Sequence, residues 1–576
     1  MYIKQLFIKR FRGIHLLAWS PRKGVNCLVG PGDSCKTTVL DAIDLLFAER
    51  YNITFDDLDF YEGDTSHPIE IKAVLAELPR EFLRDDRYGL HLSGWSSGAP
   101  DKQWREEPNE AEGIEPVLAV ELVVDKSLEP DWHIVTRRND VIDRSKRISF
   151  EDRKVLSPAR VGGYSNRHLS WGRGSALQRV GPSPEELPIT LSRLIRSARK
   201  SFTQEGAGAF SEPLETISGE IEKLGVQFQK GLVANLDFAS ISMGAGGVAL
   251  HDGEIPVRCM GTGSSRLAVA ALQSSHSGAK QCFLVDELEY GLEPHRISLL
   301  VSHLRNKVAS GGQVFITTHS PTVLKELRLP EVSVCRRDGK DGRLRIRQAS
   351  KAETATNDER RYTRSQGEAL LSTKILVCEG QTEVGLMKGW ASTLPLDFQS
   401  LGVAAVDGGG DTAAFAAAIH YAESGYKVAL LTDSDNRPAP KTIEELKKNK
   451  VEHFEWGNGR CTEQELFQGV QSVELRKALL KTLLSDDGFP VKAGCGQLNG
   501  AFKTNFPELS YVFPYLTDAN NAGVIGLKAN TEKWMKMNFD LCFSIGRTYL
   551  PDVLAQADGT LAATLEELHS WLFDDA

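Results

Sequence analysis

The sequence has few features of a secreted or membrane protein. Its nine cysteines include no Cys-x-x-Cys pair, and scattered thiols in apolar stretches are typical of a reducing compartment. It also lacks a run of eighteen apolar residues, so we expect no membrane span. Residues 1–10 alternate like a strand and do not have the pattern of a signal peptide. We therefore expect a soluble, cytoplasmic protein.

The chain also lacks an excess of positive charge. Lysine and arginine number 68 against 77 aspartate and glutamate residues, a formal net charge of −9. This balance argues against a uniformly basic nucleic-acid-binding protein. It does not exclude a nuclease, because carboxylates that bind metal ions make such an enzyme acidic while a local basic patch still contacts phosphates.

A phosphate-binding loop follows the apolar stretch 24–29 and precedes an apolar-periodic helix that we expect from Val39. Strand, glycine-rich loop and helix predict a P-loop, whose backbone N–H groups hold the phosphates of ATP. Lys36 would reach the β- and γ-phosphates, and Thr37 would bind Mg²⁺. The expected ATP-binding residues of this loop are Gly30, Gly32, Asp33, Ser34, Cys35, Lys36, Thr37 and Thr38. Cys35 stands where a glycine normally precedes the lysine, which could weaken ATP hydrolysis.

A second ATPase motif lies at the end of the apolar stretch 281–285. Asp286 suits a contact to the Mg²⁺ of the nucleotide, and Glu287 suits the base that orients the attacking water. Upstream, residues 261–266 (Gly-Thr-Gly-Ser-Ser-Arg) open an alanine-rich helix, and downstream the strand predicted over 313–318 ends at a histidine.

The order of these motifs resembles that of ATP-binding-cassette ATPases of the SMC and Rad50 type. The resemblance implies that Arg12 contacts the nucleotide and that His319 senses its γ-phosphate. It also implies that Gly263 and Ser264 engage the γ-phosphate of a facing subunit. We therefore expect a homodimer or a dimer of dimers.

Between Lys36 and Asp286 the chain is longer than a compact ATPase core requires. Residues 183–235 have a helical pattern, with an apolar stripe that predicts either packing on the ATPase core or a dimerisation arm. The stripe consists of Ile217, Ile221, Leu224, Phe228 and Leu232. A basic cluster could contact DNA phosphates or form a solvated face; it consists of Arg193, Arg196, Arg199 and Lys200.

The C-terminal part begins with the apolar strand 374–378, which ends in Glu379. Glu383 follows on a helix for which Thr382 is the expected N-cap. A later strand over 428–432 precedes two further acids, Asp433 and Asp435, which share a face because residues two apart in an extended chain point the same way. Strand-end carboxylates gathered by a parallel sheet are suited to Mg²⁺ or Mn²⁺.

This order of strands and acids resembles a Toprim domain. An SMC-like ATPase followed by Toprim resembles the OLD (overcoming-lysogenization-defect) nucleases, a family that includes the nuclease subunit of Gabija anti-phage defence. The resemblance implies two metal ions held by Glu379, Glu383, Asp433, Asp435 and Glu463. It implies catalytic roles for Glu379, Asp433 and Asp435. It also implies a charge-neutralising lysine in Trp534-Met-Lys536, for which Lys528 and Lys533 compete with Lys536. Cys461 replaces a serine of the family pattern.

We therefore expect an α/β protein: an ABC/SMC-like ATPase with a helical dimerisation insert, followed by a Toprim domain with a parallel sheet flanked by helices. The expected segments are 1–165 and 241–365 for the ATPase, 166–240 for the insert and 366–576 for Toprim with a C-terminal extension. The leading hypothesis is a metal-dependent DNA endonuclease, nicking or cutting both strands, which an ATPase dimer regulates. Missing winged-helix and zinc-ribbon patterns disfavour a topoisomerase and a primase.

Two alternatives remain open. One is an SMC-like ATPase clamp on DNA with a silent Toprim domain, which Cys35 favours slightly. The other is an effector held silent by a partner such as a helicase or a retron reverse transcriptase with its DNA. Crowded carboxylates argue against a silent domain, because like charges at strand ends repel one another unless a metal ion offsets them.

Overall fold

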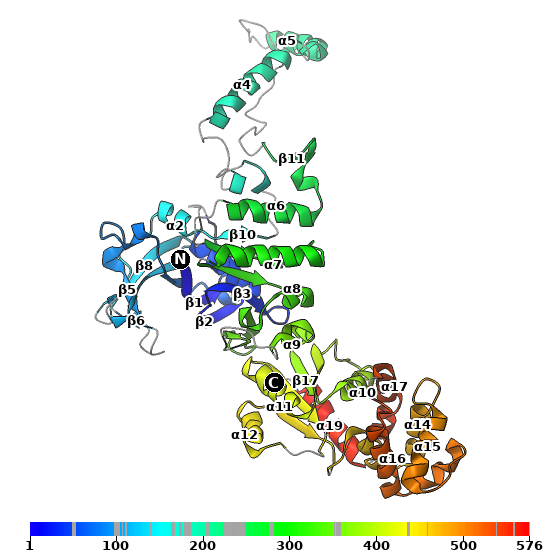
Figure 1. Ribbon diagram of the computed structural model, residues 1–576. Coiled ribbons are helices and arrows are strands. Elements are labelled where there is room, and N and C mark those ends of the chain that lie inside the picture. The colour runs from blue at the N-terminus through cyan, green and yellow to red at the C-terminus, as the bar shows by residue number, and fades with distance from the viewer. Residues whose placement is uncertain are drawn as a thin grey trace. The chain divides into compact units, whose positions relative to one another are not determined.

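The computed structural model divides the chain into two compact units (Figure 1). The first unit consists of Met1–Asn26 and Thr37–Thr318, and the second of Cys27–Lys36 and His319–Ala576. The structure describes residues 1–48, 53–96, 104–105, 107–109, 112–138, 141–162, 168–171, 175–177, 186–202, 204, 207–223, 234, 248–275, 281–309, 311–350, 352, 359–434, 438–457, 459–536, 538–556 and 559–574. Within these ranges no helix is long and apolar enough to cross a membrane.

An antiparallel sheet forms the N-terminal part of the first unit. Its strand order is β2-β1-β4-β7-β5-β6, with β8 paired to β7 and β9 to β8. The strands are β1 Tyr2–Phe11, β2 Ile14–Trp19, β4 Ile69–Ala76, β5 Ser93–Trp95, β6 Trp104–Arg105, β7 Glu115–Val124, β8 Pro130–Arg138 and β9 Val141–Asp143. The buried side chains of β1 include Leu6 and Ile8, which alternate with less buried ones as one covered sheet face requires.

Parallel strands form the ATPase part of the first unit. Strand β13 (Gln281–Val285) pairs with β10 (Ala159–Val161) on one side and β14 (Gly312–Thr317) on the other. Their carboxyl ends therefore lie at one edge, which brings Asp286 next to the end of β14. The helices of this part are α1 Lys36–Leu46, α2 Phe150–Leu156, α6 Thr262–Ser275 and α7 Pro294–Val308. Helix α1 begins at Lys36, three residues before the predicted start.

The described residues of the predicted helical insert include helices α4 (Glu186–Ser201) and α5 (Ser211–Lys223). Helix α4 exposes all four residues of the predicted basic cluster, and Ile189 and Leu194 are also exposed. Ile217 of the predicted apolar stripe is exposed on α5, whereas Leu224, Phe228 and Leu232 lie outside the described residues. Dimerisation through the insert stays a prediction, as do the segment boundaries.

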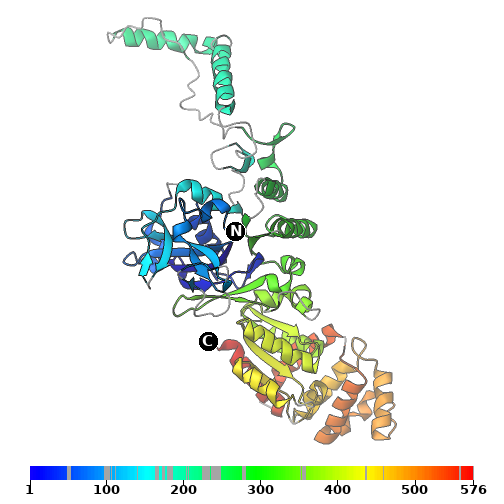
Figure 2. The same cartoon turned by 60° about the vertical axis from the view of Figure 1, so that its left-hand side comes forward.

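The second unit contains a four-stranded parallel sheet of order β18-β17-β19-β20 (Figures 1 and 2). Its strands are β17 Lys374–Cys378, β18 Val403–Asp407, β19 Lys427–Thr432 and β20 Glu452–Glu455. Helix α10 (Gln381–Ala391) connects β17 to β18, and α11 (Asp411–Glu423) returns to β19. Right-handed crossovers that run in opposite directions place their helices on opposite faces of a sheet. This arrangement confirms the predicted α/β class with a parallel sheet flanked by helices.

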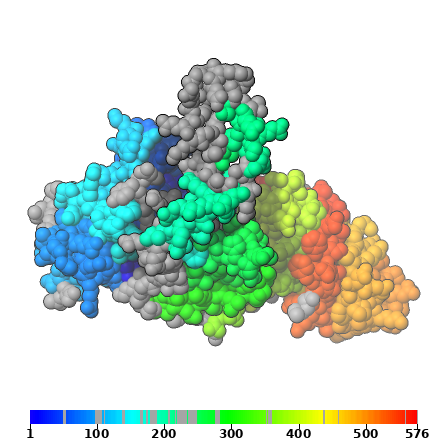
Figure 3. Space-filling view, turned by 90° about the horizontal axis from the view of Figure 1, so that it is seen from above, coloured from blue at the N-terminus to red at the C-terminus, as the bar shows by residue number. Residues whose placement is uncertain are grey.

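C-terminal helices pack against the α10 face of this sheet and share its apolar core. In the space-filling view their orange and red atoms form a continuous body (Figure 3). Helix α17 (Phe539–Thr548) approaches α10 closely, because a side chain on Gly389 would collide with the carbonyl of Phe543. The remaining helices of this body are α13 Thr462–Gln468, α14 Val473–Leu483, α15 Val491–Phe502, α16 Ala519–Thr531, α18 Leu550–Ala555 and α19 Gly559–Phe573.

The rest of the second unit lies before the Toprim sheet in sequence. Strand β15 pairs with β3 in parallel and with β16 in an antiparallel arrangement. These elements are β3 Gly24–Val29, which joins the P-loop, β15 Val332–Arg337 and β16 Leu344–Gln348, with short helices α8 Pro321–Glu326 and α9 Glu359–Arg364. Helix α12 (Pro440–Lys448) lies between β19 and β20 in sequence.

Candidate metal centre and nucleotide site

Two carboxylates meet where neighbouring strands of the Toprim sheet end. Strand β17 is followed by Glu379 and strand β19 by Asp433, and the two strands are paired in register. The backbone N–H of Asp433 donates to Oε2 of Glu379 at 3.0 Å. The backbone N–H of Glu379 in turn donates to the carbonyl of Leu431 at 3.0 Å. The parallel sheet therefore brings together the two acids that the sequence places at its strand ends.

Glu383 is held beside them by the first turn of α10. Its Oε2 accepts the backbone N–H of Gly380 at 2.8 Å, which satisfies a donor at the start of the helix. The N-cap is thus Gly380, and the prediction of Thr382 was wrong, because the helix begins at Gln381. Thr382 is buried in the first turn instead.

Thr462, the first residue of α13, contacts both Glu383 and Asp433. Its Oγ1 lies 2.6 Å from Oε1 of Glu383 and 2.8 Å from Oδ1 of Asp433. Its backbone N–H donates to the same Asp433 oxygen at 2.9 Å. The indole N–H of Trp456 donates to Oγ1 at 2.8 Å. Because a threonine hydroxyl has one hydrogen, it can donate to only one of the two carboxylates at a time.

Glu463 adds a fourth acid from the same helix. Glu463 is 3% exposed, and its Oε1 is buried without a hydrogen-bond partner among the described residues. Burial raises the pKa of Glu463 to about 7, with nearby Glu383 and Glu379 adding to the shift. Burial and then the charges of Glu383 and Glu379 raise the pKa of Asp433 to about 9. Both shifts show that the site disfavours several negative charges when no cation offsets them.

These residues fit a hard divalent cation. Carboxylate oxygens are the ligands that Mg²⁺ and Mn²⁺ prefer. Oε1 of Glu463 can serve as such a ligand, because no hydrogen bond to another described residue occupies it. Within the described ranges, no group of three or more His, Cys, Asp and Glu side chains is already arranged around a metal position. Glu383 and Asp433 are instead bonded to Thr462, and Asp435 lies outside the described residues.

Of the three candidate lysines, Lys536 is the one whose charge reaches this site. It is exposed, and its positive charge lowers the pKa of Glu463, opposing the effect of burial. Lys528 on α16 forms an ion pair at 2.7 Å with Glu532, the residue that follows the helix. Lys533 lies in the turn after that helix with a positive φ of 59°. These placements favour Lys536 as the lysine that neutralises charge at the site, and this role stays a prediction.

Cys461 precedes Thr462 at the N-cap of α13. Its thiol is 1% exposed, and burial raises its pKa to about 12. Its Sγ donates to Oε1 of Gln464 at 3.5 Å. A neutral thiol of this kind is a weak hydrogen-bond donor, so it is a poorer partner for a bound water than the serine of the family pattern.

In the P-loop, Lys36 is buried and its ammonium group lies against the loop itself. Its Nζ donates to the carbonyl of Pro31 at 2.8 Å, to that of Gly30 at 3.1 Å and to Oγ of Ser34 at 3.1 Å. Gly30 has φ +146°, and a side chain there would collide with the backbone of Cys335. The loop therefore closes around the lysine as a phosphate cradle would.

Cys35 has the backbone conformation of a glycine. Its φ is +60°, and that of Asp33 is +57°, a left-handed region that non-glycine residues adopt at a cost of roughly 1–2 kcal/mol. This explains physically why a glycine is expected before the lysine. The loop residues Gly32 and Asp33 are exposed, and Thr38 is half-buried in the first turn of α1.

The hydroxyl of Thr37 donates to Oδ1 of Asp286 at 3.0 Å, although the two residues are 249 positions apart. Thr317, at the end of β14, donates to the same oxygen at 2.5 Å and accepts the backbone N–H of Glu287 at 2.8 Å. Glu287 is exposed and has φ +46°. A threonine hydroxyl beside a strand-end aspartate suits the Mg²⁺ of a bound nucleotide.

Arg12, which the resemblance assigns to the nucleotide, forms ion pairs with two aspartates. Its Nη1 lies 2.6 Å from Oδ2 of Asp41, and its Nε lies 2.8 Å from Oδ1 of Asp59. Arg160 also binds Asp41 and lies 3.0 Å from Asp44. Nucleotide contact by Arg12 stays a prediction.

The remaining predicted ATP-site residues are placed as follows. Gly263 is buried in the first turn of α6, where a side chain would collide with the carbonyl of Gly291. Oγ of Ser264 accepts a hydrogen bond of 3.1 Å from Nη1 of Arg296. In the second unit, His319 is exposed and lines a cavity of about 840 Å³ together with Arg361.

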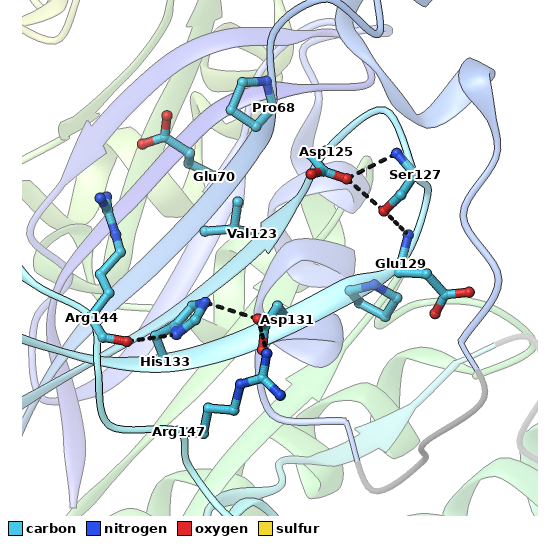
Figure 4. A pocket seen from close by; sticks show the side chains of 11 residues that line it. Pro68, Glu70, Val123, Asp125, Ser127, Glu129, Asp131, His133, Arg144 and Arg147 are labelled. Carbon is cyan, nitrogen blue, oxygen red and sulfur yellow. Dashed lines mark hydrogen bonds and ion pairs between the residues drawn. The ribbon is translucent and has the colours of Figure 1, made fainter.

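A cavity of about 510 Å³ in the first unit has charged walls whose side chains bond to one another (Figure 4). Nε2 of His133 lies 3.3 Å from Oδ2 of Asp131, and Nδ1 of His133 lies 2.9 Å from the carbonyl oxygen of Arg144. Nη2 of Arg147 lies 2.6 Å from the same Asp131 oxygen. Asp125 accepts hydrogen bonds from Ser127. These internal bonds stabilise the loops around β7 and β8, and we assign no ligand to the cavity.

The sequence analysis missed three residues of the two sites: Thr462, Trp456 and Thr317. Each is uncharged. Thr462 and Thr317 act through hydrogen bonds to acids distant in sequence, and Trp456 acts through a hydrogen bond to Thr462, which lies nearby in sequence. The position of Thr462 directly before Glu463 was the available signal.

The chain carries an ATPase region followed by a Toprim region. Residues 227–325 match the family model described as AAA domain, putative AbiEii toxin, Type IV TA system. Residues 370–435 match the model described as overcoming lysogenization defect protein-like, TOPRIM domain. The two matches occur in the order of an OLD-family ATPase–Toprim protein, which confirms the resemblance inferred from the motifs. No curated protein sequence matches the chain.

Several solved structures of SMC heads are similar to part of the chain. One is an SMC head bound to the C-winged helix domain of ScpA: 13% identity, 60% of this chain and 97% of that chain covered, TM-score 0.33. Another is the SMC head domain from Thermotoga maritima: 14% identity, coverage 60% and 98%, TM-score 0.27. A third, from Pyrococcus furiosus with an extended coiled coil and bound to the C-terminal domain of ScpA, has 13% identity, coverage 60% and 95%, and TM-score 0.32.

Proposed function

We propose that the protein is a Mg²⁺- or Mn²⁺-dependent DNA endonuclease whose Toprim site is regulated by ATP. One observation carries the proposal: Glu379, Glu383, Asp433 and Glu463 converge at one edge of a parallel sheet. Among the described residues, the fourth of these acids has a buried oxygen without a hydrogen-bond partner. Such a group of acids is costly to a fold and is expected where it binds metal ions.

In this proposal the four acids and Asp435 hold the metal ions. When bound, two divalent cations activate the attacking water and stabilise the leaving 3′-oxygen. Glu379 and Asp433, which follow the ends of β17 and β19, would hold them. Lys536, exposed beside Glu463, neutralises charge that develops on the phosphate.

The ATPase region supplies the regulation. Lys36 and the P-loop hold the phosphates, Thr37 and Asp286 hold Mg²⁺, and Glu287 orients water. The exposed arginines of α4 support a DNA-binding role for the insert. We further propose a homodimer or dimer of dimers that acts in the cytoplasm as an anti-phage effector, with a helicase or a retron reverse transcriptase as the kind of partner that restrains it.

Incubation of the purified chain with supercoiled plasmid tests the proposal. Nicked or linear DNA should form with Mg²⁺ or Mn²⁺, should disappear with a chelator, and should be absent with Glu379→Ala. Addition of ATP should change the rate for the wild type and leave it unchanged for Lys36→Ala. Cleavage that survives Glu379→Ala would overturn the assignment of the site.

A second candidate is an ATPase clamp on DNA with a silent Toprim domain. Cys35 favours this candidate, because a non-glycine residue at φ +60° adds steric strain to the P-loop and would slow ATP hydrolysis. A clamp should retain DNA in an ATP-dependent manner without metal-dependent cleavage, so the plasmid assay separates the two candidates.

A further inference from the structure

We infer that Thr462 is a positioning residue for the metal-binding carboxylates and that Trp456 orients its hydroxyl. The inference rests on the proposed function, because it concerns the same acids. It adds an uncharged residue whose effect on the site is indirect.

The hydroxyl of Thr462 joins three elements of the second unit. It is 1% exposed and lies 2.6 Å from Glu383 on α10 and 2.8 Å from Asp433 after β19, while Thr462 itself begins α13. Among the hydrogen bonds that the structure describes, none joins these two carboxylates directly to each other. Thr462 therefore fixes the position of one acid relative to the other.

Trp456 determines the direction of the hydroxyl hydrogen. Its indole N–H is a donor only, so at 2.8 Å it occupies a lone pair of Oγ1. The hydrogen of Oγ1 must then point toward the carboxylates. The backbone N–H of Thr462 already donates to Oδ1 of Asp433 at 2.9 Å, so Glu383 is the carboxylate that gains most from the hydroxyl.

Loss of this hydroxyl should weaken metal binding without unfolding the chain. Glu383 keeps its bond to the backbone N–H of Gly380, and Asp433 keeps the backbone N–H of Thr462. Partners that orient metal ligands typically contribute about 10–100-fold to metal affinity. We therefore expect Thr462→Val to weaken Mn²⁺ binding within that range, and Thr462→Ser to restore most of it.

The test is Mn²⁺ binding to the full chain, measured by electron paramagnetic resonance of the free ion and by calorimetry. The matched control is Thr432→Val, since Thr432 is also buried and contacts His453 at 2.9 Å rather than an acid of the site. Trp456→Phe should weaken Mn²⁺ binding to a smaller extent. Melting temperatures check that each variant is folded.

The outcomes separate this inference from the proposed function. If the wild type binds Mn²⁺ and Thr462→Val binds it equally well, the role of Thr462 is overturned and the metal site stands. If Thr462→Ser is as weak as Thr462→Val, packing rather than the hydroxyl is responsible, and the inference also fails. A wild type that binds no Mn²⁺ overturns both.

Discussion

The backbone N–H of Asp433 donates a hydrogen bond of 3.0 Å to the carboxylate of Glu379. This bond links the carboxyl ends of two adjacent parallel strands, so the distance between the two acids is set by the sheet rather than by flexible side chains. The bond holds the Glu379 carboxylate against the backbone of Asp433, next to the point where the Asp433 side chain leaves the sheet. The proposed metal ions would offset the negative charges that meet there.

Stabilisation by Mn²⁺ should increase with pH. The pKa of Asp433 is raised from 3.8 to about 9, so between these values the folded, metal-free chain keeps a proton that the unfolded chain loses. Its stability then falls as pH rises through that window. Metal binding requires the ionised carboxylate and releases the proton, so affinity rises with pH. Saturating Mn²⁺ should raise the melting temperature more at about pH 8 than at about pH 6.

Asp433→Asn is the control for this pH dependence. It removes a titrating carboxylate that is also a proposed metal ligand, so the stabilisation by Mn²⁺ should be small at both pH values. An equal or smaller Mn²⁺ effect at the higher pH in the wild type would contradict the raised pKa.

Cys35→Gly should raise the rate of ATP hydrolysis. Cys35 has φ +60°, which a glycine adopts without the steric cost that a side chain incurs. Cys35→Val should lower ATP binding, because a β-branched residue is a rare outlier at positive φ. Steady-state hydrolysis and nucleotide titration measure both changes. Equal activity of the glycine and valine variants would show that this backbone conformation does not limit the site.

Lys536→Ala should lower the cleavage rate by about 10²–10³-fold, the loss found when one charge-stabilising donor is removed from a transition state. Mn²⁺ affinity should change little, because Lys536 binds no metal. Lys528→Ala is the matched control, since Lys528 is paired with Glu532 at 2.7 Å. A larger loss for Lys528→Ala than for Lys536→Ala would reassign the role.

Gly389→Ala should destabilise the second unit by about 1–3 kcal/mol, the usual cost of overpacking. The added carbon would collide with the carbonyl of Phe543 on α17. Gly496→Ala is the control, because Gly496 lies in α15 with open space beside it, and it should stabilise by about 0.5–1 kcal/mol. Urea unfolding followed by tryptophan fluorescence reports the change. Destabilisation by both variants would contradict the close contact of α10 and α17.

The order of strands and acids was enough to predict the Toprim sheet. Parallel strands bring their carboxyl ends to one edge of the sheet, but β17 and β19 are neighbours although β18 lies between them in sequence. The resemblance to a Toprim domain, rather than sequence order, indicated that these two ends meet. The resemblance to the family assigned Glu463 to the metal site, whereas nothing in the residue pattern alone separates it from Glu465, two residues later on α13. Glu465 is fully buried and bound by Arg460 at 2.9 Å, whereas Glu463 has an unpartnered oxygen. That difference depends on which neighbours each side chain meets.

Hydrogen bonds across the fold were likewise hidden from the sequence. Thr462 and Trp456 have no pattern of their own, because their roles depend on where α13 lies against α10 and β19. The N-cap at Gly380 was missed because glycine has no capping side chain, and the capping carboxylate comes from Glu383, three residues later. The P-loop was easier to predict, because its contacts lie within a few residues.

The metal site is the central claim, and anomalous diffraction from crystals soaked in Mn²⁺ tests it most directly. The account predicts anomalous peaks beside Glu379, Asp433 and Glu463, with Glu379→Ala losing them and Glu452→Gln, an exposed acid at the opposite end of the sheet's edge strand, keeping them. A wild-type map at saturating Mn²⁺ with no peak beside these carboxylates would contradict it.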